Sequence, residues 1–325
     1  MAAIKPSARK NRNNPARRRW LVGGLAVFLL FDLGLVFVAF TATKPVSSAG
    51  TVVEPFETSA PSDTEPAEVE PAVVEPVETT ATVTPTRLLA ALDSSTAWRA
   101  STGACPAASA APELTTDAGA TWESFNASIE TDASAILAIN VIDDTETSLV
   151  TLDLADCSPQ LVSTFVAGDQ WRAYPGRVAA QWYVDPATPA IVHSPIGDVA
   201  SPCANVAALA AADDSRAAIL CADASVLTTQ DAGATWSGPA SIPGAAALAA
   251  TAGGYEVAVA NPGGCIGVSL VSVSVDGTLD ATARACVTAT VNPGETAIAA
   301  GEDGILWLWA GDAFARSTDG GASWV

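Results

Sequence analysis

One octapeptide occurs three times in this chain of 325 residues and constrains its fold more than any other feature. Each copy reads Ser/Thr-x-Asp-x-Gly-x-Ser/Thr-Trp, and the copies cover residues 115–122, 229–236 and 317–324. In such a turn the Asp carboxylate accepts backbone N–H groups, the Gly supplies a positive φ, and the hydroxyls bond the carboxylate or the backbone. The Trp covers the apolar side of the turn. A hairpin turn that recurs with the same residues predicts a fold of repeated β-units.

The octapeptide resembles the Asp-box, or BNR repeat, of β-propellers such as sialidases, sortilin-type receptor domains and photosystem assembly propellers. In that family the box joins the third and fourth strands of a blade at its periphery, away from the central site. The resemblance therefore implies a structural role and no catalytic one for the matching residues. These residues are Thr115, Asp117, Gly119, Trp122, Thr229, Asp231, Gly233, Trp236, Ser317, Asp319, Gly321 and Trp324.

The spacing of the three boxes predicts the number of blades. The first two Asp residues are 114 positions apart and the last two 88, which divide into three units of 38 and two of 44, the length of a propeller blade. We expect six blades that begin near residues 88, 135, 176, 205, 246 and 295, with seven as the alternative. Because Val325 directly follows the last box, we expect a segment near 80–86 to supply the outer strand of the final blade.

The hydrophobic pattern from about residue 87 onward also predicts an all-β fold. Short runs of Ala, Val, Ile and Leu, such as 135–142, 148–154 and 266–275, alternate with clusters of Asp, Gly, Ser and Pro. The alanine-rich segment 244–250 could be read as a helix, and we interpret it as a closely packed inner strand.

The N-terminal segment predicts a membrane anchor. Residues 1–19 contain seven Lys and Arg side chains and no acid, which is typical of a cytoplasmic tail. Residues 20–41 are almost wholly apolar, with Asp32 as the single charge, and are long enough for one transmembrane helix. We predict an uncleaved signal-anchor that leaves the C-terminal domain outside the cell membrane. Cleavage near Ser47 and Ala49 is the alternative.

A linker is expected between this anchor and the domain. Residues 42–86 are rich in Pro, Glu, Thr and Val, and Val-Glu-Pro occurs at 53–55, 69–71 and 74–76. Proline removes hydrogen-bond donors and the acidic residues repel one another, so this stretch should be a disordered stalk. The propeller is expected over 87–325. Scarce lysine and abundant alanine suggest a bacterial source.

Six cysteines all lie in the segment that we place outside the cell, and their even number predicts three disulfides in an oxidising compartment. Fifteen pairings are possible, so the sequence leaves the connectivity open. We expect neighbours in sequence to pair, since each pair would then lie within one β-unit or two adjacent ones. The expected pairs are Cys105–Cys157, Cys203–Cys221 and Cys265–Cys286.

The motifs that the sequence lacks favour binding over catalysis. There is no nucleophile elbow, phosphate loop or metal-ligand spacing, so we expect no catalytic residue, cofactor or metal. We interpret His193 as an ordinary strand or surface residue, and the acidic pairs at 143–144 and 213–214 as solvated turns. From residue 87 onward seven arginines face 26 acidic residues, which disfavours nucleic acid. We predict a binding or assembly module for an extracytoplasmic protein, peptide or glycan.

The alternative function is that of a sialidase-like exo-glycoside hydrolase. By family resemblance such an enzyme needs three arginines around a carboxylate, a Tyr–Glu pair and an Asp. An Arg-Ile-Pro motif is absent, and the acidic domain would repel an anionic sugar. The residues available for these roles are Arg87, Arg99, Arg172, Arg177, Arg216, Arg284, Arg316, Tyr174, Tyr183 and Tyr255.

Overall fold

A computed structural model of the chain describes residues 82–282 and 284–325. The expected cytoplasmic tail, the expected transmembrane helix with Asp32, and most of the expected linker lie outside these described residues. Within 82–282 and 284–325, no helix is long and apolar enough to cross a membrane. The regular secondary structure of the described residues is almost wholly β-strand, as the sequence predicted.

The strands form six sheets, which we call A to F in chain order. Sheets A and B contain β1 (Arg87–Ala91), β2 (Ala97–Ser101), β3 (Glu113–Thr115), β4 (Glu123–Ser124), β5 (Ala133–Val141), β6 (Thr147–Asp153), β7 (Pro159–Thr164) and β8 (Arg172–Ala173). Sheets C and D contain β9 (Ile191–Ser194), β10 (Gly197–Ala200), β11 (Val206–Ala211), β12 (Ala217–Cys221), β13 (Ser225–Thr229) and β14 (Ala240–Ser241). Sheets E and F contain β15 (Ala245–Thr251), β16 (Gly254–Ala260), β17 (Gly267–Ser274), β18 (Leu279–Asp280), β19 (Val287–Thr288), β20 (Thr296–Ala300), β21 (Leu306–Ala310) and β22 (Ala313–Ser317). The short helices are α2 (Ser128–Thr131), η1 (Pro175–Ala180) and η2 (Glu302–Gly304).

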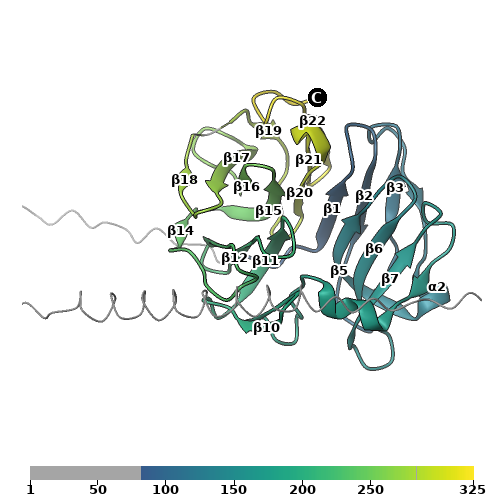
Figure 1. The fold of residues 1–325 in the computed structure, drawn as a ribbon. Helices are drawn as coiled ribbons and strands as arrows, with labels where there is room; N and C mark the ends of the chain where they lie inside the picture. The colour runs from purple at the N-terminus through teal and green to yellow at the C-terminus, as the bar shows by residue number, and fades with distance from the viewer. Residues whose placement is uncertain (1–81, 283) are drawn as a thin grey trace, which may run out of the picture. The chain divides into compact units, whose positions relative to one another are not determined.

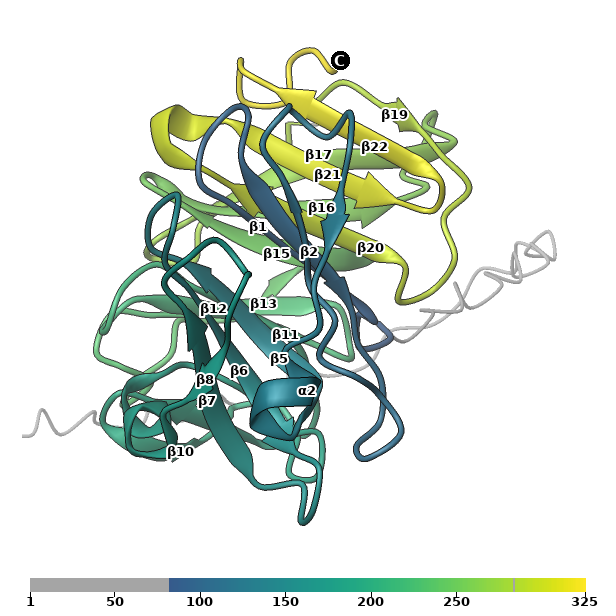
Figure 2. The same cartoon turned by 90° about the vertical axis from the view of Figure 1, so that its right-hand side faces the viewer.

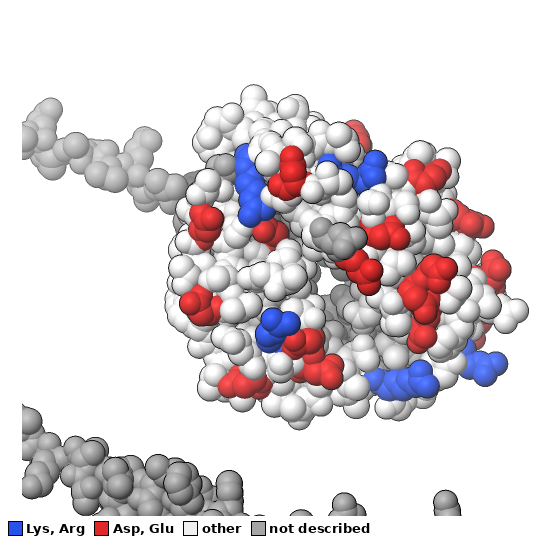
Figure 3. All heavy atoms as spheres, turned by 45° about the horizontal axis from the view of Figure 1, so that its top comes forward, with Lys and Arg blue, Asp and Glu red and all other residues white. Residues whose placement is uncertain are grey.

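The sheets follow one another around a ring (Figures 1 and 2). Every strand pair is antiparallel, and the first strand of a sheet packs against the first strand of its neighbour, as β1 does against both β5 and β20. The contact between β1 and β20 brings the first sheet against the last. In Figure 3 the viewed face is hollowed at the centre of this ring, and acidic side chains are spread around the hollow. The fold is a β-propeller, with apolar clusters between adjacent sheets.

The number of regular blades is five, against the six that the repeat spacing predicted. Sheets A, B, D, E and F have three to five strands, whereas sheet C is a two-stranded hairpin extended only by an isolated bridge between Tyr183 and His193. The segment that precedes sheet D contains five prolines, each of which lacks a backbone donor. These residues are Pro175, Pro186, Pro189, Pro195 and Pro202. A full ladder cannot form there, so the expected third blade is reduced.

The alternation of strand directions gives the ring two different faces. Loops that join the first strand of a sheet to the second, and the third to the fourth, all lie on one face, and the three octapeptides lie there too. We call it the turn face. The loops between second and third strands lie on the opposite face together with all six cysteines, and we call it the disulfide face. The bonded pairs are Cys105–Cys157, Cys203–Cys221 and Cys265–Cys286, so the expected connectivity is confirmed.

The expected closure by residues 80–86 is wrong for the part of that segment that the structure describes. Thr82 donates its backbone N–H to the Ala222 carbonyl at 2.8 Å, and Thr86 donates to Gly294 at 2.8 Å, so the segment runs along the disulfide face. The partner of β22 is instead Val325, which exchanges two backbone hydrogen bonds of 2.9 Å with Arg316. The prediction failed because residues 82–86 bond to loops on the disulfide face, after β12 of sheet D and before β20 of sheet F, and not to the outer edge of β22. The alanine-rich stretch is a strand, β15, as predicted.

Candidate functional site

The three octapeptides adopt one hydrogen-bonded turn. In the first copy the carboxylate of Asp117 accepts the Thr121 N–H at 2.8 Å and the Thr121 hydroxyl at 2.6 Å. The Thr115 hydroxyl donates to the same carboxylate at 2.9 Å and accepts the Gly119 N–H at 2.9 Å. The copies around Asp231 and Asp319 repeat this pattern.

These hydrogen bonds explain the electrostatics of the turns. The hydroxyl and the backbone N–H of Thr121 stabilise the charged form of Asp117 and lower the pKa of its carboxyl. The hydroxyl of Thr235 acts in the same way on the pKa of Asp231. Bonds led by the Ser323 hydroxyl lower the pKa of Asp319 to about 2. Each carboxylate thus accepts hydrogen bonds from residues of its own turn.

A fourth turn of the same shape lies in sheet B, at residues that do not match the octapeptide pattern. Residues 164–171 read Thr-Phe-Val-Ala-Gly-Asp-Gln-Trp, and Gly168 donates its N–H to the Thr164 hydroxyl at 2.9 Å. The backbone conformation also matches, because φ is 53° at Ala167 and 101° at Gly168. Val166 stands at the position of the Asp. The shorter pattern Thr-x-x-Ala-Gly-x-x-Trp is the signal that would have found this turn.

Each of the four turns docks its glycine on the sheet that precedes it in the ring. The approach is close, since a Cβ on any of three of these glycines would lie 2.7 or 2.8 Å from an apolar side chain of that sheet. Those three pairs are Gly119 with Phe314, Gly168 with Phe125, and Gly233 with Val199. The turns therefore fill the gaps between sheets with apolar contacts.

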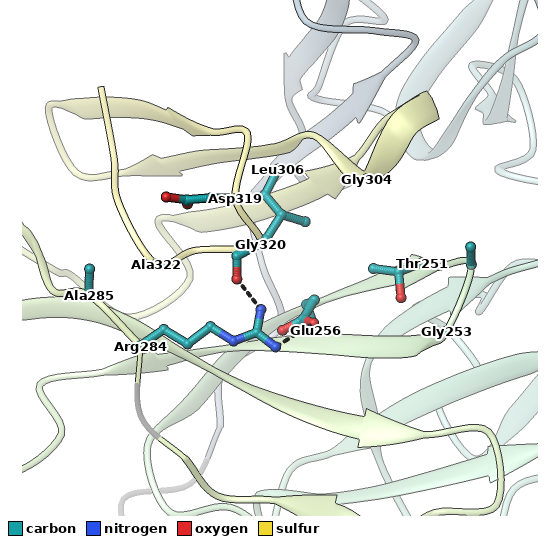
Figure 4. A pocket seen from close by; sticks show the side chains of 11 residues that line it. Thr251, Gly253, Glu256, Arg284, Ala285, Gly304, Leu306, Asp319, Gly320 and Ala322 are labelled. Carbon is teal, nitrogen blue, oxygen red and sulfur yellow. Dashed lines mark hydrogen bonds and ion pairs between the residues drawn. The ribbon is translucent and has the colours of Figure 1, made fainter.

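The contact between sheets E and F adds a charged side chain to this pattern. A Cβ on its glycine, Gly321, would lie 3.2 Å from Cδ1 of Leu270 on β17 and 3.1 Å from Cδ of Arg284. A cleft of about 670 Å³ lies beside this contact and is shown in Figure 4. The residues that line it are Thr251, Ala252, Gly253, Glu256, Arg284, Ala285, Gly304, Leu306, Asp319, Gly320 and Ala322.

An ion pair lies at the base of this cleft. A guanidinium nitrogen of Arg284 is 3.1 Å from Oε1 of Glu256, and the same guanidinium donates to the Ser272 hydroxyl and to the Gly320 carbonyl. The Ser272 hydroxyl in turn donates to Glu256 at 3.0 Å. The side chains of Glu256 and Arg284 are 10% and 25% exposed. Glu256 comes from β16 and Gly320 from the octapeptide of sheet F, so the cleft spans two sheets.

Glu256 is the one charged residue that is buried among those the structure describes. Burial raises the pKa of its carboxyl, and the charge of Arg284 opposes that rise. Removing a carboxylate from water costs several kcal/mol unless it is paired and hydrogen-bonded, as it is here. The pair is neutral overall and presents an acceptor beside a donor, which suits a polar, uncharged ligand group such as a hydroxyl or an amide.

The arginines and tyrosines proposed for a hydrolase do not converge on one site. Arg87 and Arg99 lie against Trp309, and Arg316 donates to the Ser94 carbonyl at 2.7 Å. Arg216 pairs with Asp213. Arg87, Arg99 and Arg316 lie at the contact between sheets A and F, whereas Arg216 lies on sheet D, and each is already engaged.

The tyrosine of β16, Tyr255, is almost completely buried, and desolvation raises the pKa of its hydroxyl to about 12. Tyr183 stacks on His193 with ring centroids 4.4 Å apart, and His193 Nδ1 lies 2.6 Å from Asp198. Tyr174 lies at the rim of sheet B, in a different pocket. The three tyrosines thus have separate surroundings.

The acidic pairs that the sequence singled out close turns. Asp143 accepts the backbone N–H groups of Thr145 and Glu146 at 2.8 and 2.7 Å. Asp213 does the same for Ser215 and Arg216. Asp93 forms a third turn of this kind. The turn closed by an Asp carboxylate is therefore a repeated motif of the fold, in addition to the octapeptide.

No family model matches this sequence, and no curated protein matches it. Solved structures with a similar fold include a structure described as YCF48 bound to D1 peptide, at 19% identity and a TM-score of 0.28, covering 76% of this chain and 67% of that one. A six-bladed fungal lectin from Aleuria aurantia matches at 10% identity and a TM-score of 0.44, covering 76% and 95%. PorZ of Porphyromonas gingivalis matches at 11% identity and a TM-score of 0.35, covering 75% of this chain and 38% of that one.

At these identities the likeness is one of fold alone. The closed ring of antiparallel sheets is what makes this chain a β-propeller.

Proposed function

We propose that the chain is a membrane-tethered, extracytoplasmic β-propeller that serves as a binding or assembly module for a protein, peptide or glycan partner. The observation that carries this proposal is the buried Glu256–Arg284 pair in the cleft between sheets E and F. At the corresponding contacts of the other three turns the glycine faces apolar side chains alone, whereas Gly321 faces Arg284 as well as Leu270. A charged pair added to such packing contributes little stability, so its presence at one contact favours a role in recognition.

The chemistry of the cleft indicates what kind of group it would bind. The carboxylate of Glu256 accepts and the guanidinium of Arg284 donates. The hydroxyl of Thr251 donates to the Gly254 carbonyl at 3.1 Å and can accept from a ligand. Small residues around them leave room for a ligand. Vicinal hydroxyls of a glycan, or the amide groups of a peptide, satisfy such a set of donors and acceptors without adding charge.

The sequence outside the described residues supports the tether. Seven basic residues, a long apolar run and an acidic linker precede the domain, in the order expected for a signal-anchor. The three disulfides support an oxidising compartment. We assign the three octapeptides the structural role of Asp boxes.

The sialidase-like alternative is less well supported by the geometry. It needs three arginines around one substrate carboxylate and a tyrosine next to a glutamate. Arg87, Arg99 and Arg316 are instead engaged with tryptophans or a carbonyl group at the contact between the first and last sheets.

The test is a glycan array and a peptide array probed with the full-length protein in detergent. We expect a bound ligand whose affinity falls at least tenfold in the double variant Glu256→Gln/Arg284→Met. Arg216→Gln is the matched control, because it breaks an exposed ion pair elsewhere on the domain. Thermal melting of each variant shows whether it is folded.

Two results would count against the proposal. Binding that survives the double variant would exclude the cleft as the site. Turnover of a fluorogenic sialoside that is lost in arginine variants would establish the hydrolase instead.

A further inference from the structure

A second pocket lies at the rim of sheet B, at the fourth turn. It has a volume of about 490 Å³. In Figure 2 its elements β7, β8 and α2 lie close together at the outer edge of the domain, and α2 contacts β8. The residues that line it are Glu130, Ser163, Phe165, Val166, Gln170, Trp171, Arg172 and Tyr174.

The turn that forms this pocket has exchanged polar residues for apolar ones on an exposed surface. Phe165 and Val166 are 44% and 46% exposed. At the same two positions the other turns have a polar residue followed by the Asp, as in Thr116-Asp117 and Gln230-Asp231. The rest of the turn is retained, including the Thr164–Gly168 hydrogen bond. The exchange places two partly exposed apolar side chains next to each other at the edge of the pocket.

The aromatic side chains of the pocket form a small platform. The rings of Phe165 and Tyr174 meet edge to face with centroids 6.1 Å apart. The guanidinium carbon of Arg177 lies 4.7 Å from the centroid of Tyr174. Aromatic surfaces of this kind bind proline rings and the polyproline II conformation.

Two arginines beside the platform are free to bind an anion. Within the described residues, Arg172 and Arg177 are the two arginines that donate no side-chain hydrogen bond, and no carboxylate of those residues lies within 4.0 Å of either. Both are exposed. The one carboxylate that lines the pocket, Glu130, accepts the backbone N–H of Trp171 at 2.6 Å. A ligand for this pocket should therefore carry a carboxylate close to proline and a small apolar side chain.

The chain contains such a ligand three times, because Val-Glu-Pro occurs at 53–55, 69–71 and 74–76. We propose that the pocket of Phe165, Tyr174 and Arg172 binds a Val-Glu-Pro segment of the same chain's linker. The proline packs on the aromatic platform, the valine fills the space beside Val166, and the glutamate pairs with Arg172 or Arg177.

The length of the linker permits this contact. The first described residue, Thr82, lies on the disulfide face, and the segment 53–55 precedes it by 27 residues. In polyproline II form 27 residues span about 80 Å, whereas a domain of this size has a radius of gyration of about 18 Å. Attachment to the same chain also gives the segment an effective concentration in the millimolar range, which favours it over a free peptide.

The test uses the full-length protein and a labelled peptide of residues 67–78, which contains two of the segments. A linker variant, Glu54→Gln/Glu70→Gln/Glu75→Gln, should leave the pocket vacant, so fluorescence anisotropy should show the peptide binding at least tenfold more tightly to it than to the wild type. Adding Phe165→Ser and Arg172→Gln to the linker variant should abolish that binding. Both positions are exposed, and Arg216→Gln is the matched control. Hydrogen exchange of residues 163–174 should be slower in the wild type than in the linker variant.

Three outcomes would overturn the proposal. One is that the peptide binds neither protein, or binds both equally well. Another is that it binds unchanged when Phe165 and Arg172 are replaced, which would place its site elsewhere. If the wild type is protected only at concentrations at which light scattering shows a dimer, the occupant is the linker of a second copy and the same-chain contact is wrong.

Discussion

The guanidinium carbon of Arg99, on β2 of the first sheet, lies 4.9 Å from the ring centroid of Trp309, on β21 of the last sheet. The same guanidinium is 4.0 Å from the ring of Trp122, and Arg87 covers Trp309 at 4.3 Å. Cations and aromatic rings thus alternate across the contact that closes the ring. Glu113 holds Arg99 in place with a hydrogen bond of 2.6 Å.

Replacing this arginine should weaken the closure. Arg99→Ala removes two cation–π contacts and one ion pair, and we expect it to lower the free energy of unfolding by about 1–2 kcal/mol. Arg99→Lys should recover part of that loss, because it keeps the charge but not the planar stacking. Urea denaturation followed by tryptophan fluorescence measures both. An Arg99→Ala protein as stable as the control Arg216→Ala would show that the alternation does not hold the ring.

The glycine of the fourth turn should tolerate no side chain. Gly168 has a φ of 101°, and a Cβ there would lie 2.8 Å from the ring of Phe125. Gly168→Ala should therefore cost about 1–3 kcal/mol through strain and displacement of the ring. Gly176→Ala is the matched control, since no atom lies within 4 Å of its Cβ position, and it should be neutral or slightly stabilising. Equal melting temperatures for the two variants would contradict this account.

The three octapeptide turns should make the domain sensitive to acid. Hydrogen bonds lower the pKa of Asp319 from 3.8 to about 2, and they lower the pKa of Asp117 and Asp231 in the same direction. A carboxyl whose pKa is lower in the folded state stabilises the fold above its unfolded value. That contribution is lost as the pH falls through the folded value, here between about pH 4 and pH 2.

The triple variant Asp117→Asn/Asp231→Asn/Asp319→Asn tests this pH dependence. It should be less stable than the wild type at pH 7 and should lose less stability on acidification. The urea midpoints of the variant and of the wild type are measured from pH 7 to pH 2. Midpoints that fall by the same amount in both proteins would contradict the prediction.

The three disulfides should differ in what they contribute. The Cys105–Cys157 bond closes a loop of 52 residues and joins sheets A and B, whereas Cys203–Cys221 closes one of 18 within sheet D. In the chain-entropy account, removing the first should cost about 4 kcal/mol and removing the second about 3 kcal/mol. Paired Cys→Ala variants measured by urea denaturation should show this order. The reverse order would mean that strain or residual structure, and not loop length, decides the contribution.

The sequence predicted those features whose interactions are short in range. An octapeptide contains all the donors and acceptors of its turn, so the conformation of 115–122 follows from its own residues. The strand periodicity and the pairing of cysteines between neighbouring units are local in the same sense. The sequence of the fourth turn does not match the octapeptide, because Val166 stands at the position of the Asp. The glycine and the hydroxyl that set its backbone conformation are present.

Only the tertiary structure decided the closure of the ring, the reduced third blade and the candidate site. Arg284 and the Gly320 carbonyl are 36 residues apart, and nothing near either residue indicates that a cleft will form between their sheets. In the same way, Arg99 and Trp309 meet only because the first and last sheets come together. Such contacts depend on how sheets pack around a common centre. That packing is a property of the whole ring, so no single segment of the sequence contains it.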